Sequence, residues 1–84
     1  MNSSSKIVVT FGKVIKQRRN QLRISQEKLA ELAGLHRTYI SQIERGIKTP
    51  SLKSVVAIAN GLSIKPHELL LMIEKNLNDN NNYI

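Results

Sequence analysis

Apolar residues recur three and four positions apart in five segments of the chain, with polar residues between them. That spacing places apolar side chains on one face of a helix. The pattern therefore predicts helices over residues 10–22, 26–33, 37–45, 52–60 and 66–76. We therefore expect an all-α fold built from five helices that are joined by short connections.

The predicted helix starts rest on residues that cap a first turn. A hydroxyl just before the turn accepts a hydrogen bond from a free backbone N–H, and suitable residues are Thr10, Ser25 and Ser51. His36 is an unusual cap for the 37–45 helix. Residues 7–9 leave two alternatives open, an extension of the 10–22 helix or a short extended arm.

The two ends of the chain lack a core pattern. The first residues are small and polar, and the last ones are rich in Asn. Such ends are typical of tails. We therefore expect one helical domain over residues 10–76, with tails over residues 1–9 and 77–84.

Positive charge is concentrated in the N-terminal part of the chain. The formal net charge is +7 over 84 residues. Residues 1–53 hold 11 Lys and Arg against three Glu, whereas residues 54–84 hold two Lys against three acidic residues. A basic surface favours a polyanionic partner, although charge also serves solubility alone.

Several classes of protein are not expected from this composition. The chain has no Cys, and its apolar runs fall short of the about 20 residues that span a bilayer. The N-terminus lacks the pattern of a secretion signal. His36 and His67 have no partner ligands at metal spacing, so no metal or other cofactor is expected. No catalytic Ser–His–acid arrangement or phosphate-binding glycine loop is evident, so the chain is not expected to be an enzyme.

The 37–45 helix is predicted to carry an uninterrupted polar face. With about 100° per residue, five polar side chains fall within an arc of about 140°; they are Arg37, Thr38, Ser41, Gln42 and Arg45. Apolar residues occupy the opposite side. Arg and Gln can form paired hydrogen bonds with guanine and adenine edges in a DNA major groove. An ordinary amphipathic surface helix has the same arc.

The spacing of four residues favours the DNA-binding interpretation. Ala30 is small enough for two helices to cross steeply, and Gly34 accepts the positive φ of a tight turn. Ile40 and Ile43 supply the inward face of the second helix. Together these positions match a helix-turn-helix formed by the 26–33 and 37–45 helices.

The chain resembles the lambda-repressor-like, or Xre-type, helix-turn-helix family over residues 11–72. The resemblance is carried by the runs RRNQLRI, SQEKLAELAG and TPSLKSVVAIANGLSI. The run LHRTYISQIERG is similar to controller proteins of restriction–modification systems. This resemblance implies a sequence-specific DNA-binding regulator of transcription that acts as a homodimer. A prophage or plasmid repressor and an antitoxin-type protein-binding module are the alternatives.

The resemblance also implies which residues contact DNA. The candidate DNA-binding residues are Gln26, His36, Arg37, Thr38, Tyr39, Gln42, Arg45 and Lys48. Among them, the family's base-reading positions fall on Arg37, Thr38 and Gln42. The position that binds a phosphate at the start of the 26–33 helix falls on Gln26. Arg45 and Lys48 would reach the DNA backbone from the far end of the recognition helix.

Two further features concern an ion pair and the turn before the 26–33 helix. The family pairs an Arg with a Glu near the end of the recognition helix, and these positions fall on Arg19 and Glu44. Family members often have Gly where this chain has Arg23. A left-handed Arg23 would carry strain on the order of 1 kcal/mol; otherwise the turn must differ.

The 66–76 helix is apolar around much of its circumference. Residues 69–73 read LLLMI, and five consecutive residues cannot all face one core. A symmetric contact between two chains would cover the remainder, whereas burial under neighbouring helices and the C-terminal tail is the alternative. The expected partners are double-stranded DNA, a second copy of the chain and, as a further candidate, RNA polymerase. The expected location is the cytoplasm, for a bacterial or phage-encoded protein.

Overall fold

Five helices follow one another in residues 5–79, the part of the chain that the computed structural model describes. They are α1 (Lys6–Gln21), α2 (Gln26–Ala33), α3 (Arg37–Glu44), α4 (Leu52–Gly61) and α5 (Pro66–Asp79). The predicted all-α, five-helix fold is confirmed.

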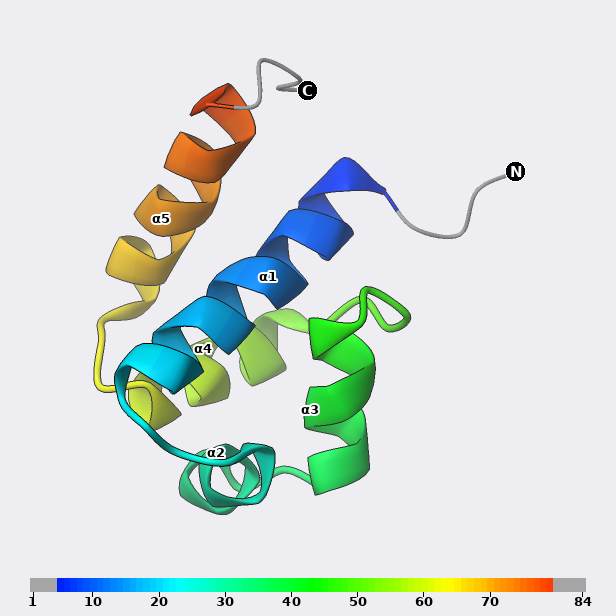
Figure 1. Cartoon of the computed structure of the whole chain (residues 1–84), viewed down its shortest axis with the longest axis vertical. Coiled ribbons are helices and arrows are strands. Elements are labelled where there is room, and N and C mark those ends of the chain that lie inside the picture. Colours follow the sequence, from blue (N-terminus) through cyan, green and yellow to red (C-terminus); the bar gives the residue numbers. More distant parts are fainter. Residues whose placement is uncertain (1–4, 80–84) are drawn as a thin grey trace.

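The long helix α1 lies at the centre of the arrangement (Figure 1). It packs against α3 on one side and α5 on the other, while α2 contacts α3 and α4. In Figure 1, α2 is seen almost end-on and α3 lies along the plane of the picture, so these two helices cross steeply. In the same view of Figure 1, α2 lies at the bottom and the C-terminus of α5 at the top.

Every helix contributes to a single core. Fully buried side chains come from all five elements and include Ile15, Leu29, Ile40, Ile43, Ile58 and Leu69. Removing each such side chain from water stabilises the fold by roughly 1.5–3 kcal/mol. The apolar face of α3 is thereby fixed against the core, which leaves its polar face outside.

The predicted start of the first helix at Thr10 is wrong. Helix α1 begins at Lys6, and the Oγ of Ser5 accepts a hydrogen bond from the backbone N–H of Val8 at 3.3 Å. Val8 is buried, and Thr10 is buried inside the helix instead of capping it. Of the two alternatives for residues 7–9, the structure has the helical extension. Burial of Val8 favours the extra turn, and the hydroxyl of Ser5 caps it.

The predicted end of the last helix at residue 76 is also wrong. Helix α5 continues to Asp79, and Leu77 is buried in the core. Residue 77 therefore belongs to a helix and not to a tail. The expectations for residues 1–4 and 80–84 lie outside the described residues.

Local backbone features match most of the capping predictions. Ser25 and Ser51 cap α2 and α4, accepting from backbone N–H groups at 2.9 and 3.1 Å. Gly34 is left-handed with φ 70°, and His36 precedes α3 without a side-chain capping bond. Arg23 has φ 59°, so the strained alternative at that turn is the one adopted.

Candidate nucleic-acid interface

The α2–α3 unit has the geometry of a helix-turn-helix. The left-handed Gly34 ends α2, and the N–H of Leu35 then donates to the carbonyl of Ala30 at 2.9 Å. Ala30, Ile40 and Ile43 are all buried. The four residues that predicted the motif thus occupy the crossing, the turn and the inner face of α3, as expected.

The opposite face of α3 is open to solvent. Arg37 and Thr38 are exposed in its first turn, and Gln42 is half-buried one turn later. His36 is exposed at the N-terminal end of the same helix. Tyr39 differs from them, because its half-buried side chain packs against the core. The three predicted base-reading side chains therefore lie on one accessible face.

A tight turn follows α3 and places two more basic residues beside it. The carbonyl of Gln42 accepts from the backbone N–H groups of Ile47 at 2.9 Å and Lys48 at 3.3 Å. Arg45 and Lys48 are exposed, and the Nε of Arg45 donates to the carbonyl of Ser41 at 3.3 Å. Within residues 5–79, no ion pair engages Arg37, Arg45 or Lys48. Their charges remain available to an anionic partner.

A buried ion pair joins the end of α3 to α1. Arg19 Nε lies 2.8 Å from Glu44 Oε2, and Arg19 Nη2 donates to Glu44 Oε1 at 3.1 Å. The predicted Arg19–Glu44 pair is therefore present, with bidentate geometry. Arg19 Nη1 also donates to the carbonyl of Ile24 at 2.9 Å, which holds the turn before α2. One guanidinium thus connects α1, the α1–α2 turn and the recognition helix.

The predicted phosphate-binding residue is tied to the same carboxylate. Gln26 Nε2 donates to Glu44 Oε1 at 3.0 Å, across the start of α2 and the end of α3. The sequence pattern carries no signal for this contact, because it depends on the crossing of two helices. The start of α2 is consequently joined to the end of α3, next to Arg45.

The chain matches the Helix-turn-helix family over residues 15–69. It belongs to the helix-turn-helix family. Among its relatives is the control protein C.BamHI of Bacillus amyloliquefaciens, which is 43% identical over 80% of this chain and 84% of the relative.

Solved structures of restriction–modification controller proteins share the fold. The wild-type controller protein C.Esp1396I superposes with a TM-score of 0.84 at 33% identity, covering 89% of this chain and 97% of the other. The controller protein C.AhdI of Aeromonas hydrophila gives a TM-score of 0.71 at 40% identity, covering 74% and 94%. The resemblance to the Xre-type family and to controller proteins is confirmed.

Gly12 is a residue of this helix-turn-helix protein that sequence reasoning missed. A Cβ at this position would meet the carbonyl oxygen of Ile43, and that of Glu44 at 2.8 Å. Helix α1 therefore touches the backbone at the end of α3 directly. A glycine within a strongly helical pattern is the available signal for such a close approach.

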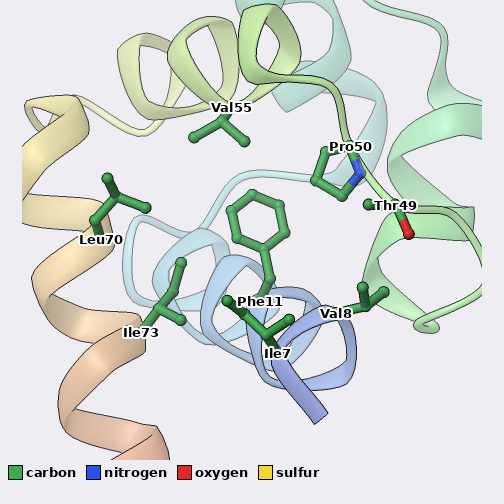
Figure 2. Close-up of a pocket in the computed structure, with 8 residues that line it drawn as sticks. All are labelled: Ile7, Val8, Phe11, Thr49, Pro50, Val55, Leu70 and Ile73. Carbon is green, nitrogen blue, oxygen red and sulfur yellow. The ribbon is translucent and has the colours of Figure 1, made fainter. Parts of the chain in front are cut away.

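A second surface of the protein is apolar. An open hollow of about 180 Å³ lies between α1, the connection before α4, and α5. Figure 2 shows its lining, with Phe11 at the base and Ile7, Pro50, Val55 and Leu70 around it. Small-molecule sites typically measure roughly 300–1,000 Å³ and carry a few convergent polar groups, so this hollow is small and apolar by comparison.

Further apolar side chains are exposed on the two helices that supply Val55 and Leu70 to this lining. On α5, Leu70 and Leu71 are 53% and 54% exposed, and on α4 Leu52 is 80% exposed. Leu69 and Ile73 are buried, so the predicted division of residues 69–73 between core and surface is found. Among the described residues, no helix is long and apolar enough to cross a membrane, and no group of three metal-ligating side chains occurs.

Proposed function

We propose that this protein binds a specific duplex DNA sequence as a homodimer and regulates transcription of a restriction–modification operon. The observation that carries the proposal is the exposed polar face of α3, with Arg37 and Thr38 open to solvent opposite buried Ile40 and Ile43. A helix held in this way can enter the major groove without moving relative to the core. The names of its relatives supply the class of operon.

Base recognition is assigned to three side chains. Arg37, Thr38 and Gln42 lie on the accessible face of α3. Arg can contact both acceptors of guanine, Gln can pair with adenine, and Thr can hydrogen-bond or contact the thymine methyl group. His36 and Tyr39 flank these residues and would make additional contacts at the groove.

Backbone contacts are assigned to both ends of the helix-turn-helix. Gln26 starts α2, where free N–H groups and the helix dipole favour a phosphate. Arg45 and Lys48 follow α3 and are exposed. Contacts of this kind fix the register of the protein on DNA but do not read its sequence.

Dimerisation is assigned to the apolar surface around α5. A standard interface buries about 800 Å² per partner, roughly a seventh of this protein's solvent-accessible surface of 5626 Å². Leu70, Leu71 and Leu52 provide exposed apolar area for such a contact. Two recognition helices would then enter successive major grooves about 34 Å apart on a pseudo-palindromic site. A regulator of this kind acts in the bacterial cytoplasm, and contact with RNA polymerase would accompany activation.

Selection of bound duplexes from a random pool tests the proposal. We expect an enriched pseudo-palindrome whose half-sites are separated by about one helical turn, 10–10.5 base pairs. Titrations of the selected and a scrambled duplex at two salt concentrations should give a preference of at least about 10³-fold. Affinity for both should fall steeply as salt rises.

Three outcomes would contradict the proposal in whole or in part. Equal affinity for the selected and scrambled duplexes would remove sequence-specific binding. Binding that does not respond to salt would show that phosphate contacts do not contribute, and would favour a protein-binding module. An enriched sequence without two-fold symmetry, together with a monomeric mass in light scattering, would contradict the homodimer but not the recognition of a specific DNA sequence.

A further inference from the structure

The side chain of Gln26 is held before any DNA is bound. Its Nε2 donates to Glu44 Oε1 at 3.0 Å. The Glu44 side chain is only 2% exposed and also accepts two hydrogen bonds from Arg19. The acceptor of the Gln26 amide is therefore a buried group that is itself fixed from a second helix.

The chemistry of this contact sets the orientation of the amide. An ionised carboxylate only accepts hydrogen bonds, so it must face the NH₂ group and not the carbonyl oxygen of Gln26. An amide nitrogen carries two hydrogens, and Glu44 uses one. The second N–H of Gln26 has no other partner among residues 5–79.

We propose that Glu44 is a positioning residue that holds Gln26 ready to donate its second amide N–H to a DNA phosphate. The inference rests on the proposed function, because it presumes that Gln26 contacts the DNA backbone. Arg19 is the third member of this arrangement. Its guanidinium neutralises Glu44, so a carboxylate can lie one side chain away from the phosphate without repelling it.

Preorganisation of this kind has a measurable consequence. A free Gln side chain must be immobilised when DNA binds, and that ordering opposes association. For a single side chain the cost corresponds to an affinity loss of about three- to tenfold. Removing the acceptor should therefore weaken DNA binding, even though Glu44 does not touch DNA itself.

The decisive variant replaces both members of the ion pair, Arg19→Met with Glu44→Met. Removing one partner would leave a buried charge, whereas replacing a buried pair by apolar residues of similar size is often tolerated. The double change also leaves the net charge at +7, so long-range attraction to DNA is unaltered. Circular dichroism and thermal unfolding establish that the variant is folded.

The test compares Gln26→Ala in the wild-type and Arg19→Met/Glu44→Met backgrounds, by titration with the selected duplex. We expect Gln26→Ala to weaken binding about tenfold in the wild type and at most about threefold in the double variant. The matched control is Arg45→Ala, which should cost the same factor in both backgrounds. An equal cost of Gln26→Ala in the two backgrounds would show that the pair is structural only, and would overturn the proposal.

Two further measurements distinguish a failure of this inference from a failure of the proposed function. If Gln26→Ala has no effect in the wild type while Arg37→Ala still relaxes preference at one base pair per half-site, this inference is overturned and the proposed function stands. If the double variant does not fold, hydrogen exchange of the Gln26 side-chain amide in the ¹⁵N-labelled wild type decides. One protected amide proton in the free protein and two in the DNA complex are expected. Two unprotected protons in the free protein would overturn the proposal.

Discussion

Replacing Gly12 by Ala tests whether the recognition helix is held by direct backbone contact with α1. The added Cβ would meet the carbonyl oxygens of Ile43 and Glu44, the latter at 2.8 Å, with the Glu44 carbonyl carbon at 3.0 Å. All three are backbone atoms at the end of α3, and the side chain of Ile43 is fully buried. No side chain can rotate away to relieve the contact, so α1 or α3 must shift.

The expected destabilisation follows from two opposing terms. Forcing an extra carbon into a packed site typically costs about 1–3 kcal/mol, and three close backbone contacts place Gly12 near the upper value. Ala is favoured over Gly in a helix by about 1 kcal/mol. The net loss is then about 2 kcal/mol, which lowers the Tm of a domain this size by roughly 8–16 °C.

Thermal and urea denaturation of Gly12→Ala measure this loss directly. Gly34→Ala is the matched control, because an added Cβ there meets nothing within 4 Å and the cost is backbone strain of about 1 kcal/mol at φ 70°. Helix propensity alone would make Gly12→Ala stabilising. A variant as stable as the wild type, or one less affected than Gly34→Ala, would refute the proposed contact between α1 and α3.

Three further predictions concern the proposed function. Arg37→Ala should cost about 1–3 kcal/mol in binding and relax preference at one base pair per half-site; a uniform loss across sequences in competition titrations would make Arg37 a phosphate contact. Arg45→Ala should weaken binding to all duplexes alike and lower the slope of log affinity against log salt concentration by about one. An unchanged slope would show that Arg45 does not contact the DNA backbone. Leu71→Lys should shift the mass from dimer to monomer in light scattering, whereas Leu32→Lys, equally exposed on α2 at 51%, should not; equal behaviour of the two variants would contradict the α5 interface.

The helix-turn-helix was predictable because its determinants are local. Gly34 lies at a turn where a positive φ excludes most residues, and Ala30 lies where two backbones cross. Both constraints act within a few positions and select a specific residue type. The start of α1 was not predictable in the same way. Ser5 and Thr10 can both cap a helix by local rules, and the choice of Ser5 is tied to the burial of Val8 in the fold.

The candidate site likewise combines features set by the local sequence pattern with a contact that depends on the tertiary fold. The polar face of α3 follows from helical periodicity, so Arg37, Thr38 and Gln42 could be placed from their spacing. The contact between Gln26 and Glu44 joins residues 18 positions apart on two helices. Its existence depends on the crossing of α2 and α3, which no local pattern encodes.

Because α2 and α3 cross, Glu44 contributes both to stability and to the proposed recognition of DNA. Its carboxylate is held by Arg19 from α1 and in turn holds Gln26 at the start of α2, while its carbonyl lies against Gly12. The end of α3 is therefore fixed by its side chain and its backbone together. Since α3 cannot turn without breaking this arrangement, the orientation of its exposed face, which carries Arg37, is set by residues that face the interior.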